Sequence, residues 1–199
     1  MTATLYLPDS NIFIASYRLN HPFDYKEFHP FWRWMEKLAE DRLIAMVDVV
    51  YDELVNEQAA DPDMLDLWVR AVFKGRQISH KDDRYAQVYA KIQDYLVTCG
   101  QYTEGSRQYW ESEGKADPWL IAVAKVEGAV IVTDEARVPL QQGQHMKKEP
   151  RIPNIADQFG VKTMNLRRFF DTNGRLKKAQ YVPSEPKSRR KAASQPGLF

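Results

Sequence analysis

The sequence has a single cysteine, Cys99, and only four histidines among its 199 residues. One cysteine cannot form an internal disulfide or a cysteine-rich zinc site, and four scattered histidines make a histidine-based metal cage a poor prediction. No apolar run reaches the roughly 18 residues of a membrane span, and the mean hydropathy is −0.55. The N-terminus lacks the basic segment of a signal peptide. These absences favour a soluble protein of a reducing, cytoplasmic compartment, without a membrane partner.

The small net charge of +1 conceals an asymmetry along the chain. Residues 175–199 carry a charge of +6, whereas the first 174 residues carry −5. Lysine, arginine, serine and proline dominate the end of the chain, a composition that buries too little apolar surface to become ordered. We therefore expect one folded domain over residues 1–176 and a basic, disordered C-terminal tail over 177–199. Blocks of one charge at a terminus are typical of interaction arms.

Short apolar runs alternate along the chain with stretches of helical periodicity. Strands are predicted at 4–7, 129–133 and 161–164, with a short extended piece at 43–46. Helices are predicted at 29–41, 47–58, within 61–98 with a break near 79–82, and at 117–128, 153–160 and 166–170. Residues 100–114 fit either a long connection or a weakly patterned helix. The alternation predicts an α/β domain with a largely parallel sheet.

Several acidic residues fall where this pattern places functional sites. Asp9 follows the first predicted strand, and Asp134 and Glu135 follow the strand at 129–133. Glu53 and Asp117 lie on or at the start of predicted helices. Sites in parallel sheets form beyond the carboxyl ends of the strands. Carboxylates gathered there repel one another unless a cation lies between them, and hard oxygen donors suit Mg²⁺ or Mn²⁺.

Each acid also has an ordinary structural explanation. Asp117 directly precedes a proline, which is typical of a helix N-cap followed by proline at the first helical position. Asp9 is typical of a turn, and Glu53 of a solvated helix face. Asp134–Glu135 is typical of the polar end of a strand. By themselves, these residues indicate an α/β domain with a candidate acidic site and name no activity.

The joint order of the motifs resembles that of the PIN-domain nucleases, in their VapC-like toxin branch. The motifs are Asp9-Ser10-Asn11-Ile12-Phe13-Ile14, Glu53 in a helix, Ala116-Asp117-Pro118-Trp119 opening a helix, and Val130-Ile131-Val132-Thr133-Asp134-Glu135. The segment Ile152–Val161 is similar to the closing segment of a less characterised PIN subfamily with a helical insert. The resemblance covers about residues 4–171 and implies a PIN-like three-layer α/β/α fold with a mostly parallel central sheet.

The resemblance implies roles for individual residues. Four acids match the catalytic, metal-binding positions of the family: Asp9, Glu53, Asp117 and Glu135. The fourth is more often Asp in the family, so Asp134 is the neighbouring alternative. Ser10 and Thr133 match supporting positions that hydrogen-bond water or carboxylate. Because side chains alternate along a strand, we expect Glu135 to share the face of Thr133, and Asp134 to face solvent or cap the following turn.

The resemblance also implies an activity and partners. It implies a Mg²⁺- or Mn²⁺-dependent endoribonuclease that leaves 5′-phosphate and 3′-hydroxyl ends, acts as the toxin of a toxin–antitoxin pair, forms a homodimer and is blocked by a protein antitoxin. Because an acidic cluster repels RNA, basic residues must meet the phosphates. The basic candidates for RNA binding are Lys115, Arg137, Lys147, Lys148 and Arg151. The aromatic candidates for base stacking are Tyr102, Tyr109 and Trp110.

Three alternatives compete with this interpretation. A catalytically inactive PIN-like fold would serve as an RNA- or protein-binding scaffold, and loss of one acid would mark it, whereas all four acids are present. A structure-specific DNA nuclease of the same superfamily is disfavoured by the small size and by the lack of an appended helix–hairpin–helix segment. A phosphatase with an aspartyl nucleophile needs a second Asp two residues after the first, and position 11 is Asn.

Overall fold

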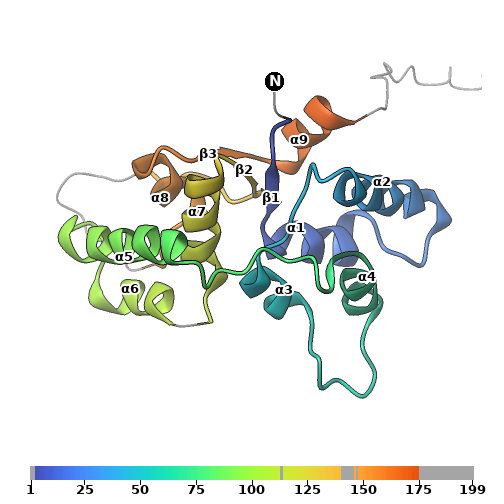
Figure 1. The fold of residues 1–199 in the computed structure, drawn as a ribbon, viewed down its shortest axis with the longest axis horizontal. Helices are drawn as coiled ribbons and strands as arrows, with labels where there is room; N and C mark the ends of the chain where they lie inside the picture. Colours follow the sequence, from blue (N-terminus) through green and yellow to red (C-terminus); the bar gives the residue numbers. More distant parts are fainter. Residues whose placement is uncertain (1–2, 113, 140–145, 147, 175–199) are drawn as a thin grey trace, which may run out of the picture.

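The centre of the fold is a parallel sheet of three strands (Figure 1). The structure is a computed structural model that describes residues 3–112, 114–139, 146 and 148–174. The strands lie in the order β1-β2-β3, with bounds Tyr6–Pro8, Val130–Val132 and Lys162–Met164. In register, Leu7 pairs with Ile131 and Ile131 with Thr163. Because all three strands run in one direction, their carboxyl ends meet at one edge of the sheet.

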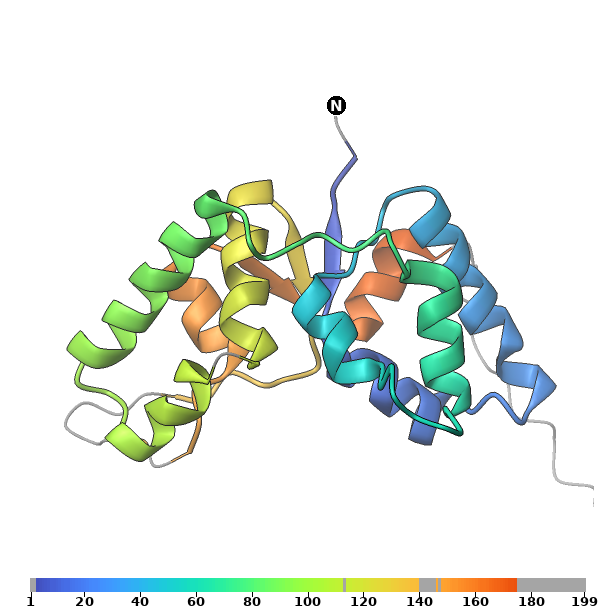
Figure 2. The same ribbon diagram turned by 60° about the horizontal axis from the view of Figure 1, so that its bottom comes forward.

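Helices form most of the remaining described chain. They are α1 (Ser10–Ala15), α2 (His29–Glu40), α3 (Asp48–Leu54), α4 (Met64–Phe73), α5 (Asp83–Thr98), α6 (Glu104–Glu111), α7 (Ala116–Glu127), α8 (Ile152–Gln158) and α9 (Leu166–Asn173). A π-helical turn, Ser16–Asn20, and a 3-10 turn, Lys26–Phe28, lie between α1 and α2. Figures 1 and 2 show α5–α8 gathered on one side of β1, with α2, α4 and α9 on the other.

Both faces of the sheet are covered, as is usual for parallel sheets. Successive side chains of a strand point to opposite faces, yet all three residues of β2 are buried. The run Leu120–Ala124 of α7 is also buried throughout. Helix α5 packs along α7, where Tyr89 stacks on Trp119 with 4.0 Å between ring centroids. This arrangement confirms the predicted α/β class with a parallel sheet, and it makes α7 a helix of the core.

The helices predicted between the first two strands are present with altered ends. The two helices predicted within 61–98 correspond to α4 and α5, and the weakly patterned stretch at 100–114 contains α6. The helix predicted at 47–58 is shorter, because α3 ends at Leu54 and a loop follows. The prediction of a helical segment at this place in the chain is therefore confirmed, with more loop than expected.

The remaining fold predictions concern the extended piece at 43–46, the C-terminal tail and membrane-spanning helices. The short extended piece expected at 43–46 is confirmed, because Ile44 forms an isolated parallel bridge to Tyr6. The predicted tail over 177–199 lies outside the described residues. Within the described ranges, no helix is both long and apolar enough to cross a membrane.

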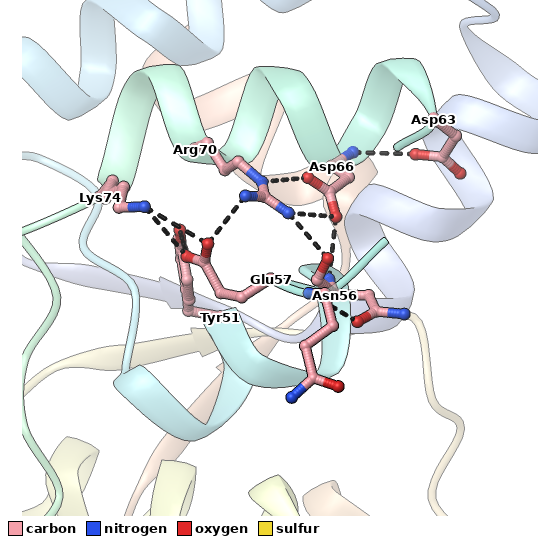
Figure 3. Close-up of polar contacts among 8 residues, drawn as sticks. Tyr51, Asn56, Glu57, Asp63, Asp66, Arg70 and Lys74 are labelled. Carbon is pink, nitrogen blue, oxygen red and sulfur yellow. Dashed lines mark hydrogen bonds and ion pairs between the residues drawn. The ribbon is translucent and has the colours of Figure 1, made fainter. Parts of the chain in front are cut away.

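A polar network fixes the loop that follows α3, the helix that carries Glu53 (Figure 3). Arg70 on α4 contacts both carboxylate oxygens of Asp66. The same guanidinium donates to the carboxylate of Glu57 at 2.8 Å and to the carbonyl of Asn56 at 2.8 Å. The Asp66 carboxylate also accepts from the N–H of Asn56 at 2.8 Å. Arg70 therefore ties α4 to the chain just beyond Glu53.

The partners of this network differ in burial. Asp66 is buried, and the guanidinium of Arg70 lowers the pKa of its carboxyl group, aided by the N–H of Asn56. Lys74 lies at the rim of the network, where 61% of its side chain is exposed and Nζ is 3.2 Å from Glu57. The Arg70–Asp66 contact is thus the structural centre of the network, and the Lys74–Glu57 contact is a surface ion pair.

Arg70→Met should lower the melting temperature clearly more than Lys74→Met does. The first change leaves the buried Asp66 carboxylate without its cation, whereas exposed pairs contribute little. Because the folded pKa of Asp66 is lowered, this stabilisation is present above its ordinary value of 3.8 and is lost as the pH falls through the folded value. Thermal unfolding of both variants at neutral and acidic pH measures this, and equal losses at neutral pH would contradict it.

Candidate functional site

Strand β1 carries Asp9 to the carboxyl edge of the sheet. The backbone N–H of Asp9 donates to the carbonyl of Val132 at 2.9 Å and so continues the ladder between β1 and β2. Its carboxylate is the N-cap of α1 and accepts from the N–H of Asn11. The other carboxylate oxygen accepts from the hydroxyl of Thr133 at 3.1 Å. Asp9 is only 2% exposed, so one buried carboxylate joins the ends of two strands.

Glu53 reaches the same edge from α3. The hydroxyl of Ser10 donates to Glu53 Oε2 at 2.6 Å and lies 3.4 Å from Asp9 Oδ1. Glu53 Oε1 accepts from the N–H of Ala116 at 3.3 Å. Ala116 is the first residue of α7, so the carboxylate lies at a helix N-terminus, where negative charge is stabilised. Ser10 and Glu53 thereby connect the ends of β1, α3 and α7.

Asp117 lies in the first turn of α7, and the N-cap of that helix is Lys115. The capping explanation for Asp117 is therefore wrong. Asp117 is 8% exposed, and its Oδ2 lies 3.0 Å from the ammonium of Lys115. Burial raises the pKa of Asp117 to about 7, against the opposing charge of Lys115, and the charge of Asp9 adds to the rise. The structure thus places an acid that resists ionisation within electrostatic reach of Asp9.

The two acids after β2 have separate surroundings. Glu135 pairs with Arg151 at 2.8 Å through Oε1 and accepts from the N–H of Ile152 at 2.8 Å through Oε2. Asp134 is exposed to solvent, and its carboxylate accepts from the N–H of Leu166 at 2.9 Å. The expected exposure of Asp134 to solvent is confirmed, and its carboxylate contacts the start of α9 rather than the turn that follows Asp134.

Electrostatic coupling places Glu135 with the other acids. Burial raises the pKa of Asp9, and the charge of Glu135 is the next largest contribution to that rise, with Glu53 adding less. Glu135 also raises the pKa of Asp117. The hydroxyl of Thr133 acts in the opposite direction on Asp9. The four acids named from the sequence therefore influence one another at one edge of the sheet.

Carboxylate oxygens in a buried, acidic setting are donors that suit a hard divalent cation. In the described part of the chain, however, no three His, Cys, Asp or Glu side chains lie together as a metal-ligand group. The acids instead contact partners within the protein: Asp117 contacts Lys115, Glu135 contacts Arg151, and Glu53 contacts Ser10. The donor chemistry fits a metal ion, which would compete with Lys115 for Asp117 and with Arg151 for Glu135.

The predicted basic residues near the acids differ in their contacts. Lys115 and Arg151 lie inside the acidic site as ion-pair partners. Arg137 instead pairs with Asp157 at 2.7 Å, although 56% of its side chain remains exposed. Lys148 is exposed. Among the four basic candidates that the structure describes, Lys115 and Arg151 are the two that pair with the acids.

The other predicted RNA contacts divide by burial. Tyr102 and Trp110 are buried in the core, which excludes base stacking by these two rings. Tyr109 is 64% exposed. Lys147 lies outside the described residues. The aromatic contacts proposed from the sequence thus reduce to one accessible ring.

Sequence reasoning missed Glu149, whose Oε2 lies 3.6 Å from the ammonium of Lys115. No spacing or periodicity marks this residue, because a loop between β2 and α8 brings it to the site. Sequence reasoning also missed that the backbone N–H groups of Ala116 and Ile152 donate hydrogen bonds to Glu53 and Glu135, respectively. Their positions at the starts of α7 and α8 are a recognisable signal, since helix N-termini attract carboxylates.

A family model described as "Domain of unknown function (DUF4411)" matches residues 6–176. Comparison with curated proteins found no match. Among solved structures, the chain is similar to VapBC2 from Rickettsia felis bound to a DNA fragment from their promoter, with 14% identity and a TM-score of 0.49, over 81% of this chain and 98% of that chain. It is also similar to FitAcB from Neisseria gonorrhoeae, with 18% identity and a TM-score of 0.47, over 81% and 97%.

Asp117 should destabilise the metal-free protein as the pH rises. Its pKa is about 7 in the folded chain against an ordinary value of 3.8, so the folded state ionises less readily than the unfolded state. This penalty is absent below pH 3.8, grows up to pH 7 and is constant above it. Asp117→Asn should therefore gain stability relative to the wild type across this window, by up to about 4 kcal/mol.

Urea unfolding in EDTA at several pH values measures the difference between the two proteins. The pKa of about 7 already includes the opposing effect of Lys115, so the slope of the difference with pH reports the ionisation of Asp117 in its native surroundings. A difference in unfolding free energy that does not change between about pH 4 and pH 8 would show that Asp117 ionises normally in the folded chain.

Proposed function

We propose that the chain, which belongs to the DUF4411 family, is a metal-dependent endoribonuclease with a PIN-like site. The observation that carries the proposal is the burial of Asp9 and Asp117 together at the carboxyl edge of a parallel sheet. Buried like charges are costly unless a cation compensates them, and raised carboxyl pKa values in a buried cluster are typical of functional sites. The order of the acids along the chain resembles that of PIN-domain nucleases.

The chain's residues have defined roles in this proposal. Asp9 and Asp117 would hold Mg²⁺ or Mn²⁺, together with the exposed Glu53 and the partly buried Glu135. A divalent cation held there would supply a Lewis acid for phosphodiester hydrolysis. The hydroxyls of Ser10 and Thr133 already donate to Glu53 and Asp9, respectively, and so fix the orientation of those carboxylates.

Positive charge beside the acids supports a nucleic-acid substrate. Arg151 uses one guanidinium nitrogen for Glu135, and 36% of its side chain is exposed. Lys148 is exposed in the same loop. Phosphate oxygens need such cations to approach an acidic edge. RNA as the substrate, the role of a toxin, a protein antitoxin and a homodimer follow from the family resemblance and are part of the proposal.

Asp9→Asn should abolish Mn²⁺-dependent RNA cleavage while the fold stays intact. The substitution removes a charge from the centre of the site, and lower repulsion should leave the metal-free melting temperature unchanged or higher. Asp134→Asn is the matched control, because Asp134 also follows a strand but contacts the start of α9. Its activity should stay within a few-fold of the wild type. Wild-type cleavage by Asp9→Asn would refute the assignment.

Glu135→Gln should lower Mn²⁺-dependent cleavage by at least about tenfold, because Glu135 is coupled to both buried acids. The measurement is cleavage of structured RNA at several Mn²⁺ concentrations, with single- and double-stranded DNA assayed in parallel. Activity lost in Asp134→Asn and kept in Glu135→Gln would mean that the fourth acid is Asp134. Cleavage of DNA alone would indicate a DNA nuclease, and RNA binding without cleavage would indicate a scaffold.

A further inference from the structure

Lys115 places a positive charge inside the acidic site. Its ammonium lies 3.0 Å from Asp117 Oδ2 and 3.6 Å from Glu149 Oε2, and 27% of its side chain is exposed. Lys115 is the N-cap residue of α7, but its side chain makes no capping hydrogen bond. A cation at a helix N-terminus is unfavourable with the helix dipole. The acids, and not the helix, therefore account for the position of this side chain.

Acidic groups surround the ammonium of Lys115. Burial lowers the pKa of its ammonium, but Asp117, Glu149 and Glu53 together raise it above its ordinary value. Among the charged groups around Asp117, Lys115 has the largest effect and lowers the pKa of that carboxyl. The pair is partly buried, where charges are screened less than in bulk water. The metal-free site thus already contains a cation in contact with one of its buried acids.

We propose that Lys115 is a built-in counter-ion, which occupies the Asp117 carboxylate in the metal-free protein and which a divalent cation must displace. The inference rests on the proposed function, because it takes Asp117 as a metal ligand. Ammonium and metal ion compete for the same carboxylate oxygen. Lys115 therefore stabilises the metal-free fold and weakens metal binding. A displaced ammonium next to the site is also placed to meet an RNA phosphate, which would favour metal binding when substrate is present.

Glu149 offers the displaced ammonium a second partner. It lies in the loop before α8, is 37% exposed and is already within 3.6 Å of Lys115. A short movement of the ammonium from Asp117 to Glu149 frees the Asp117 carboxylate without leaving Lys115 unpaired. Glu149 should therefore assist metal binding only while Lys115 is present. A residue that merely supports the fold would show no such dependence.

Mn²⁺ titration calorimetry without RNA tests the counter-ion role apart from nuclease activity. Lys115→Gln should bind Mn²⁺ about tenfold more tightly than the wild type, because one competing charge is removed at close range. The same variant should be less stable than the wild type in EDTA, since Asp117 loses its counter-charge. Lys115→Arg, which keeps the charge, should bind Mn²⁺ as the wild type does.

Lys125→Gln is the matched control. Lys125 is exposed in the last turn of the same helix, so its substitution removes one positive charge far from the acids. Its Mn²⁺ affinity should stay within about twofold of the wild type, because salt screens exposed distant charges. In a double-mutant cycle, Glu149→Gln should weaken Mn²⁺ binding in the wild-type background and have no effect in the Lys115→Gln background.

The outcomes separate this inference from the proposed function. Mn²⁺ affinity in Lys115→Gln equal to that in Lys125→Gln, or weaker than in the wild type, would overturn the counter-ion role and leave the metal site standing. A fall in RNA affinity alone would then assign Lys115 to phosphate contact. If neither the wild type nor any variant binds Mn²⁺, the metal site is wrong and the counter-ion role falls with it.

Discussion

Asp9 and Asp117 are buried at the carboxyl edge of the sheet, and a buried carboxylate must find hydrogen bonds or a cation. Thr133 donates to the first acid, and the ammonium of Lys115 contacts the second. Strand β1, which carries the first acid, lies far in the sequence from the neighbouring elements α7 and β2. The site therefore forms only when the chain folds. Because its negative charge must be compensated, the surrounding loops can place only certain side chains there.

The core and the site meet in α7. Its middle turns are buried against the sheet and α5, and its first turn carries Asp117 to the carboxyl edge. The packing that fixes this helix also removes Asp117 from water, which is the main cause of its raised pKa. On the other flank, Arg70 holds the loop after Glu53 in place. The packing of α7 and the contacts of Arg70 thus offset the unfavourable repulsion among the acids at the carboxyl edge.

The positions of Asp9 and Glu135 could be anticipated from the sequence, because apolar runs end just before them and parallel strands share an edge. The α/β class followed from the same alternation of strands and helices. The role of Asp117 was harder to predict, because the N-cap of α7 is Lys115 and Asp117 lies in the first turn. Which residue becomes the N-cap depends on the backbone conformation at Lys115, and the packing of α7 sets that conformation. The contact between Lys115 and Glu149 depends on how a loop closes, and no local pattern encodes that.

The most direct measurement of the central claim is an analysis of RNA ends after incubation with the purified 199-residue chain and Mn²⁺ or EDTA. The proposed acidic metal site predicts cuts that require Mn²⁺ and disappear with EDTA. The family resemblance implies that these cuts leave 5′-phosphate and 3′-hydroxyl ends. Cuts that persist in EDTA, or that leave 2′,3′-cyclic phosphates, would contradict metal-dependent hydrolysis at Asp9 and Asp117.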